Sequence, residues 1–184
     1  MSQNAFRKMP VVGVEDGSFQ KGITKKAILA AVLSKGVEIE DIKVARITVD
    51  GLDATDKLTE MLIGWDFVAV LLAGVSFAGF NIIDPTAVYE KFQKPILIVS
   101  RKKPNNKAVK QALQKHFKDW KVRWQIFEKL ETARCVVVTG ETPIYVETIA
   151  LDFRTTEKLL QALSIKSRIP EPLRVARLVA RGLS

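Results

Sequence analysis

The chain has 184 residues, of which 47% are hydrophobic, so it is not a disordered tail and is expected to form one α/β domain over residues 1–184. Its 29 lysines and arginines exceed its 20 aspartates and glutamates, giving a formal net charge of +9. This excess favours a polyanionic partner, but a heat-adapted, highly charged surface explains it equally well.

The sequence predicts neither export nor a membrane span. The residues before Pro10 lack the apolar core of a signal peptide, and glycines and polar residues interrupt the apolar stretch 67–83. The single cysteine, Cys135, lies in an apolar run and is expected to be a small buried hydrophobe, which fits a reducing compartment. We therefore expect a cytoplasmic protein with no membrane partner.

The first half of the chain is rich in predicted strands. Apolar runs bounded by turn residues predict strands at 9–14, 26–34, 37–49 and 67–72, and a short helix at 55–61. Within the third of these strands, alternation directs Ile42, Val44 and either Ala45 or Ile47 toward a core. The continuously apolar strand at 67–72 is typical of a strand that is buried on both faces.

In the second half, predicted helices and strands alternate. Asp84 is a suitable N-cap for a helix that begins at Pro85. The remaining expected elements are strands at 96–100, 122–127, 135–139 and 144–146, and helices at 106–120, 155–164 and 171–182. Antiparallel strands followed by strands alternating with helices indicate a mixed β-sheet flanked by α-helices.

The order of several motifs resembles the endonuclease V family. Residues 143–146 (Pro-Ile-Tyr-Val) and 168–176 (Arg-Ile-Pro-Glu-Pro-Leu-Arg-Val-Ala) resemble its closing segment, and Gly13-Val14-Glu15 resembles the end of its first strand. Residues 71–74 and 95–101 resemble two further strands of that family. Within the superfamily, residues 51–55 and 74–81 are most similar to an uncharacterised archaeal family related to endonuclease V. The resemblance implies a ribonuclease H-like, endonuclease V-like fold.

Endonuclease V enzymes cut nucleic acids near deaminated bases with Mg²⁺ held by acidic residues. Carboxylate oxygens suit Mg²⁺ or Mn²⁺, which activates water and neutralises charge on the phosphate. The resemblance places the catalytic and metal-binding acids on Glu15, with Asp16 beside it, and on Asp56. The second aspartate of the family falls on Ala73, and a histidine or aspartate of its last helix falls on Arg177.

Ala73 is the decisive departure from the family pattern, because alanine cannot bind a metal. Two interpretations stay open. One is a Mg²⁺-dependent phosphodiester hydrolase with a degraded acidic site, which the retained carboxylates favour. The other is a non-catalytic binding or interaction module that keeps the fold without the metal, which Ala73 and Arg177 favour. A small-molecule site in the loop 74–81 is a third alternative, supported only by its glycines.

The acidic residues also have structural interpretations. Glu15 and Asp16 are either metal ligands at a strand end or acidic residues of the turn before Gly17. Asp50, Asp53 and Asp56 are spaced three residues apart and either converge on a cation or cap the following helix. The sequence alone does not separate these alternatives.

Two basic segments are candidates for contacts with the phosphates of DNA or RNA. Helical geometry places Arg174, Arg177 and Arg181 within about 60° of one face, and Arg101, Lys102 and Lys103 follow a strand, with Arg101 at the position of the family's lysine. A solvated face with salt bridges to Glu171 is the alternative for the helix.

A loop at the end of the buried strand is expected to border the same site. Its candidate residues are Gly74, Ser76, Gly79 and Asn81. Sheets covered on both faces place their sites at such strand ends, which favours this interpretation over one in which the two glycines only shape a tight connection.

Overall fold

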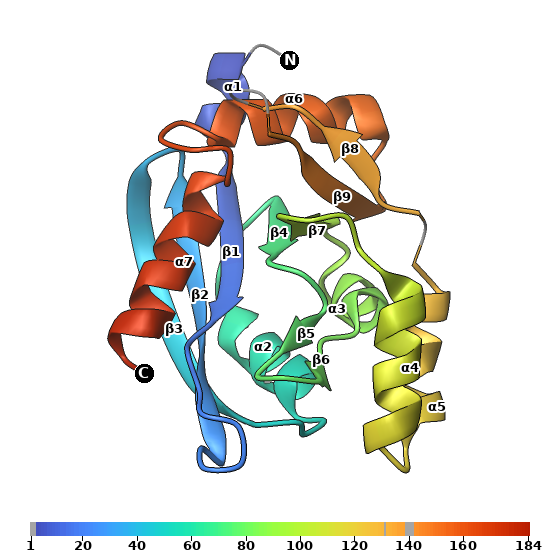
Figure 1. Cartoon of the computed structure of the whole chain (residues 1–184). Coiled ribbons are helices and arrows are strands. Elements are labelled where there is room, and N and C mark those ends of the chain that lie inside the picture. Colours follow the sequence, from blue (N-terminus) through green and yellow to red (C-terminus); the bar gives the residue numbers. More distant parts are fainter. Residues whose placement is uncertain (1–2, 131, 139–141) are drawn as a thin grey trace.

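A computed structural model describes residues 3–130, 132–138 and 142–184. Its centre is a seven-stranded mixed sheet with the order β3-β2-β1-β4-β7-β9-β8 (Figure 1). These strands are β1 (Pro10–Asp16), β2 (Lys26–Lys35), β3 (Glu38–Thr48), β4 (Ala69–Leu72), β7 (Ile96–Ser100), β8 (Arg134–Val136) and β9 (Ile144–Ile149). A separate two-stranded sheet pairs β5 (Ser76–Phe77) with β6 (Asn81–Ile82).

Strand direction brings three carboxyl ends to one edge of the large sheet. β1, β2 and β3 form antiparallel hairpins, β1 pairs with β4 and β4 with β7 in parallel, and β9 returns antiparallel to β7. The residues that follow β1, β4 and β7 therefore lie side by side. This arrangement confirms the expected mixed sheet.

Helices cover both faces of this sheet. The helices are α1 (Gln3–Arg7), α2 (Ala54–Leu62), α3 (Pro85–Phe92), α4 (Asn106–His116), α5 (Trp120–Glu128), α6 (Phe153–Leu163) and α7 (Glu171–Gly182). The core on one face includes residues of α2 and α3, whereas the core on the other face includes residues of α1, α6 and α7. In Figure 1, α4 and α5 stand together at the side of the molecule, away from α7.

A glycine allows α7 to lie directly on β1. A Cβ atom built on Gly13 would collide with the backbone of Pro172 and Leu173, so only glycine fits at this point of the strand. A Cβ atom built on Gly17, one residue past β1, would likewise collide with the Ala180 carbonyl near the other end of α7. The glycines therefore hold the arginine-bearing helix against the strand that carries Glu15.

The predicted strand at 122–127 is wrong, because this segment is helical. The expected helix at 106–120 ends at His116, and α5 begins at Trp120. Alternating apolar residues such as Val122 and Trp124 matched a strand pattern, but the buried residues of α5 are Arg123 and Phe127, which are four apart as on one helix face. Packing of α5 against α4 therefore determines the structure of this segment.

Two exposure predictions for β3 are also wrong. Ile42 and Val44 are 40% and 48% exposed, whereas Ala45 packs against the core and Ile47 is fully buried. β3 is the edge strand, and α2 covers only the face that carries Ala45 and Ile47. On the other face α7 packs on β1 and β2, so the more distant side chains of β3 reach solvent.

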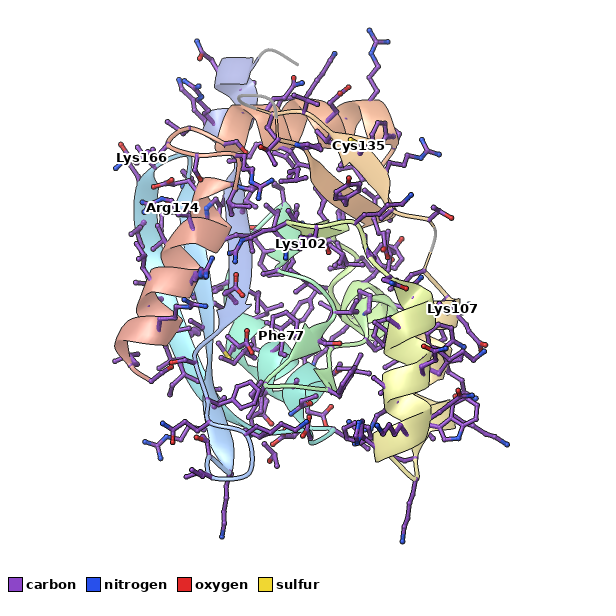
Figure 2. All side chains as sticks on the ribbon, in the orientation of Figure 1. Phe77, Lys102, Lys107, Cys135, Lys166 and Arg174 are labelled. Atoms are coloured by element: carbon purple, nitrogen blue, oxygen red, sulfur yellow. The ribbon has the colours of Figure 1, made fainter. Side chains whose placement is uncertain are left out.

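Cys135 is exposed rather than buried. It lies on β8, the strand at the opposite edge of the sheet, where Val136 alone of the three strand residues is buried (Figure 2). The expected strand at 135–139 ends earlier in the structure, and Thr139 is outside the described residues. Within the described segments, no helix is long and apolar enough to cross a membrane.

Candidate functional site

The candidate site lies where β1, β4 and β7 end. Glu15 is the penultimate residue of β1, Ala73 follows β4, and Arg101 follows β7. The Ala73 amide donates to the Val14 carbonyl at 3.0 Å, which fixes Ala73 beside the end of β1. The sheet therefore brings together three positions that are far apart in the sequence.

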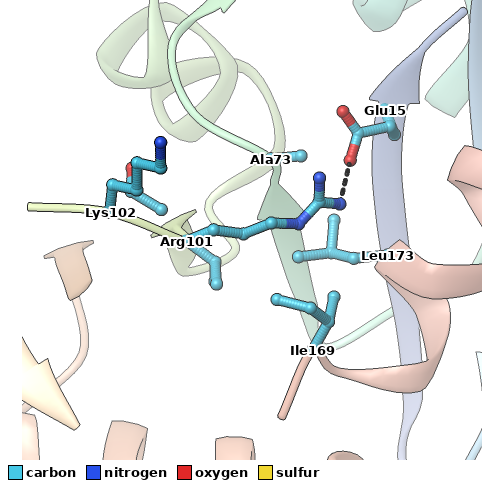
Figure 3. A pocket seen from close by; sticks show the side chains of 8 residues that line it. Glu15, Ala73, Arg101, Lys102, Ile169 and Leu173 are labelled. Carbon is cyan, nitrogen blue, oxygen red and sulfur yellow. Dashed lines mark hydrogen bonds and ion pairs between the residues drawn. The ribbon is translucent and has the colours of Figure 1, made fainter. Parts of the chain in front are cut away.

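Glu15 and Arg101 form the centre of a pocket. Arg101 donates from Nη2 to Glu15 Oε2 at 3.1 Å, and the guanidinium crosses the space next to Ala73 (Figure 3). The cavity has a volume of about 360 Å³, and Leu173 forms part of its wall. We call it the Glu15 pocket; its lining residues are Glu15, Ala73, Val99, Ser100, Arg101, Lys102, Ile169 and Leu173.

Two opposing effects determine the charge of Glu15. Burial raises the pKa of its carboxyl from 4.5 to about 7, although Arg101 opposes this change and Asp16 adds to it. The positive charges of Arg177 and Arg181 also lower the pKa, to a smaller extent. Because burial outweighs the cations, Glu15 changes its charge near neutral pH.

The arginines of α7 differ in their availability. Arg177 is partly buried and Arg181 is exposed, and both act electrostatically on Glu15. Arg174 instead forms a bidentate ion pair with the buried Glu171, at 2.6 and 2.8 Å. Arg177 and Arg181 of the predicted arginine stripe therefore belong to the surroundings of Glu15. Arg174 instead forms the salt bridge to Glu171 that was the alternative interpretation of this helix.

Asp16 lies next to Glu15 in sequence but on the other face of the sheet. Successive side chains of a strand point to opposite faces. Asp16 Oδ2 accepts a hydrogen bond from the Ala78 amide at 2.6 Å, which ties the 74–81 loop to the end of β1. Burial raises the pKa of Asp16, and the hydrogen bond from Ala78 opposes the rise.

The three aspartates 50, 53 and 56 do not converge. Asp50 accepts from the Phe80 amide at 2.8 Å, and Asp53 accepts from the amide and hydroxyl of Thr48. Burial alone would raise the pKa of Asp53, but the hydrogen bonds from Thr48 and Asn81 together outweigh it and lower the pKa. Asp56 is exposed in the first turn of α2 and does not line the Glu15 pocket.

The described residues do not fit a resident Mg²⁺ or Mn²⁺ ion. Glu15 is the only carboxylate in the pocket and is paired with a cation, and Ala73 has no ligating atom. Within residues 3–130, 132–138 and 142–184, no group of three or more acidic, histidine or cysteine side chains is arranged to hold a metal. The structure thus does not bring Glu15, Asp16 and Asp56 together.

The basic segment after β7 reaches from the pocket to the molecular surface. Lys102 lines the Glu15 pocket on the side away from Glu15, and Lys103 is exposed farther along the segment (Figure 3). Lys102 and Lys107 mark the path of this segment from the centre of the molecule to α4 (Figure 2). The segment that follows β7 therefore forms a line of positive charge across the surface.

The loop between β4 and α3 contains residues of two kinds. Gly74 and Gly79 have positive φ angles of 96° and 85°, and only Gly74 has open space beside it. Ser76 is partly buried in β5. Asn81 is fully buried and bonds to Thr48, Asp53 and Ala54, so its amide has a structural role.

Sequence reasoning missed two buried charged residues. Arg123 in α5 donates to the carbonyls of Asp50, Gly51 and Phe80, which joins two loops to α5. Glu147 in β9 is buried, and its Oε2 atom has no hydrogen-bond partner within the described residues. A lone acidic residue inside the strand-like run 144–149 was the one available signal for Glu147.

A family model described as "Endonuclease dU" matches residues 7–184. The chain belongs to this family. Its relatives include a UPF0215 protein of Pyrococcus furiosus, 34% identical over 189 residues that cover 100% of this chain and 96% of that protein. A UPF0215 protein of Thermococcus gammatolerans is 37% identical over 180 residues, covering 94% and 91%. The Endonuclease dU family thus includes UPF0215 proteins of archaea.

Solved structures agree on the fold. A protein of unknown function from Archaeoglobus fulgidus has a TM-score of 0.81 and 30% identity, covering 96% of this chain and 98% of that one. Endonuclease V of Ciona intestinalis, solved with an inosine-containing DNA, has a TM-score of 0.64 at 15% identity, covering 98% and 93%. These likenesses confirm the expected ribonuclease H-like, endonuclease V-like fold.

Proposed function

We propose that this Endonuclease dU family protein binds a nucleic-acid strand, DNA or RNA, with a phosphate at the Glu15 pocket. The observation that carries the proposal is the cluster of Arg101, Arg177 and Arg181 around a single carboxylate at the carboxyl end of β1. Guanidinium groups bind phosphates strongly, and the exposed Lys102 extends the positive surface. The name of the family makes deoxyuridine-containing DNA the first ligand to test.

Fluorescence anisotropy with labelled 24-nucleotide strands tests this proposal. Single-stranded DNA, duplex DNA and RNA are compared, each with and without one deoxyuridine or uridine substitution. The double variant Arg177→Gln/Arg181→Gln should bind at least tenfold more weakly, because two charge-assisted contacts are lost. Arg174→Gln is the matched control on the same helix, and its affinity should equal that of the wild type because Glu171 already holds Arg174.

Phosphodiester cleavage is the second candidate function. It is favoured by the position of Glu15 at the strand end and by its pKa of about 7, which suits proton transfer near neutral pH. A gel assay with Mg²⁺, Mn²⁺ or EDTA separates binding alone from cleavage. Loss of strand cleavage in Glu15→Gln, with binding retained, would support an enzyme.

Restoring the missing carboxylate provides a direct test of the metal question. We expect calorimetry with millimolar Mn²⁺ to show no saturable binding by the wild type. Ala73→Asp should bind Mn²⁺ measurably, because it places a second anionic oxygen ligand beside Glu15. Ala73→Asn is the control, since it adds an oxygen ligand without charge. Tight Mn²⁺ binding by the wild type that is lost in Glu15→Ala would contradict the expectation.

A further inference from the structure

β3 leaves one whole edge of the large sheet free. Its 11 residues pair with β2 on one side, and no strand of the described residues pairs with its outer side (Figure 1). The opposite edge of the sheet differs, because β8 has only three residues. Proteins commonly keep edge strands short or blunt them with charge, since an open edge is a template for a further strand. The length of β3 therefore calls for an explanation.

Three apolar side chains form a row on β3, on the face of the sheet that carries α7. Ile39, Ile42 and Val44 are 48%, 40% and 48% exposed. A β-bulge leaves Glu40 without an opposite residue on β2 and so brings Ile39 onto the same face as the other two. Single exposed apolar residues are normal on a protein surface, but a contiguous row is a feature of interaction surfaces.

α7 extends this apolar surface beside β3. Helical geometry places Val175 and Val179 on the side of α7 opposite to Arg177, which acts on Glu15. Both valines are partly exposed, and Leu178 between them is 60% exposed. Because α7 packs on β1 and β2, a partner that covers this face of β3 also reaches the valine side of α7.

The backbone of β3 also presents donors that point away from the sheet. The Val49 amide donates to the Lys25 carbonyl at 2.9 Å, so alternation along the antiparallel pair directs the amides of Ile42 and Val44 outward. Asp41 Oδ1 accepts from the Ile42 amide at 2.7 Å, on the side where the carbonyl of a further strand would accept. This carboxylate is exposed, so a carbonyl of an incoming strand can replace it.

The side chains of β3 match those of a second β3 that runs antiparallel to it. With Ile42 opposite Ile42 of the second copy, the bulge sets Val44 opposite Ile39, so the apolar side chains of both copies form one row. On the other face Asp41 lies opposite Lys43 of the second copy, and two-fold symmetry repeats this pair. Opposite charges across two strands stabilise their pairing. A register centred on Lys43 would instead set two lysines face to face.

We propose that the protein forms a two-fold homodimer in which the β3 strands of two copies pair antiparallel, centred on Ile42. The pairing joins two seven-stranded sheets into one, covers the exposed apolar row and gives the outward amides of β3 carbonyl partners. Assembly stops at two copies, because a two-fold interface uses the same surface on both. The dimer does not depend on the proposed phosphate site, which lies where β1, β4 and β7 end.

Sedimentation velocity of the full chain tests the dimer. At about 50 µM, above the micromolar dissociation constants of the weaker specific interfaces, the wild type should sediment with twice the 20.5 kDa mass of one chain. Ile42→Glu places two carboxylates face to face and should weaken the dimer by about 100-fold or more. Val122→Glu is the control, because Val122 is 56% exposed on α5, and this variant should stay dimeric. Circular dichroism verifies that both variants are folded.

Charge reversal tests the register and the identity of the partner. Asp41→Lys sets lysines opposite Lys43, and Lys43→Asp sets aspartates opposite Asp41, so each variant alone should be monomeric at the same concentration. An equimolar mixture of the two variants should form heterodimers, because every lysine then faces an aspartate. Changes within one chain do not explain such a recovery, since the mixture contains the same two chains.

Three results would overturn the proposal. They are a wild type that stays monomeric at about 500 µM, an Ile42→Glu variant that dimerises as well as the wild type, and a mixture without heterodimers. Assembly beyond two copies would likewise contradict the two-fold pairing. A monomer that instead binds an extended peptide along β3 would assign this edge to another partner and also overturn the homodimer.

Discussion

The carboxyl groups of Glu15 and Glu147 are both withdrawn from solvent, yet their surroundings differ. Burial raises both pKa values to about 7. Glu15 has Arg101 at 3.1 Å and two further arginines on α7, whereas Glu147 has no ion-pair partner within the described residues. A similar pKa therefore arises from burial opposed by cations in one site and from burial alone in the other.

This difference separates the chemistry that each site can perform. We expect an ionised Glu15 to compete with an incoming anion for Arg101, so that protonation of Glu15 makes Arg101 available. When Glu147 ionises, an uncompensated charge is left in the interior, which costs stability. Three variants sharpen the comparison.

The largest expected effect is on stability, through Glu147→Gln. The folded-state pKa lies above the ordinary value of 4.5, so the stabilisation is complete below about pH 4.5 and is lost as the pH rises through about 7. Between pH 4.5 and pH 8, urea denaturation should show the wild type losing about 3 kcal/mol relative to the variant. Glu90→Gln, at an exposed position on α3, is the control and should follow the wild type.

Gly13→Ala should disturb α7 and the Glu15 pocket without disturbing β9. The new Cβ would collide with the backbone at the start of α7, which should cost about 2 kcal/mol in a urea denaturation experiment. DNA affinity should fall as the α7 arginines shift. Gly182→Ala, at an open position of the same helix, should preserve stability. Unchanged stability in Gly13→Ala would contradict the described contact between β1 and α7.

Glu15→Gln should remove a pH dependence of DNA binding. Lowering the pH from 8 to 6 protonates Glu15 in the wild type and releases Arg101, so affinity should rise by about tenfold, the equivalent of one charge-assisted contact. Anisotropy titrations of the variant should show the stronger affinity at both pH values. His116 is the single histidine and is exposed, so His116→Gln is the matched control for loss of an imidazole. A pH effect that persists in Glu15→Gln would exclude this role of Glu15.

Sequence reasoning predicted the mixed sheet and the strand end that carries Glu15, because Gly13-Val14-Glu15 and the closing helix have strong local patterns. It did not predict the roles of the acidic residues. Asp16 and Asp50 accept from amides of the 74–81 loop, up to 62 positions away, and Asp53 accepts from the Thr48 amide at the end of β3. Contacts of this range depend on the tertiary fold and leave no periodic signal in the sequence.

The same limit explains the wrong strand prediction in α5 and the two alternatives that stayed open for the arginine stripe. Arg123 is buried because three carbonyls from distant loops converge on it, which no local pattern indicates. Arg174 and Arg177 share a helical face, but Glu171 is within reach only of Arg174. The sequence does not distinguish an arginine that forms an ion pair, such as Arg174, from one that stays available for a phosphate, such as Arg177.

The most direct test of the central claim is the salt dependence of nucleic-acid binding. If Arg101, Lys102, Arg177 and Arg181 contact phosphates, counterion release predicts a log–log slope of about −3.6, so affinity should fall roughly 100-fold between about 50 and 200 mM salt. Arg177→Gln/Arg181→Gln should reduce the slope by about half and weaken binding similarly for all sequences, because phosphate contacts do not read bases. A folded wild-type protein that binds no DNA or RNA at low salt would contradict the account.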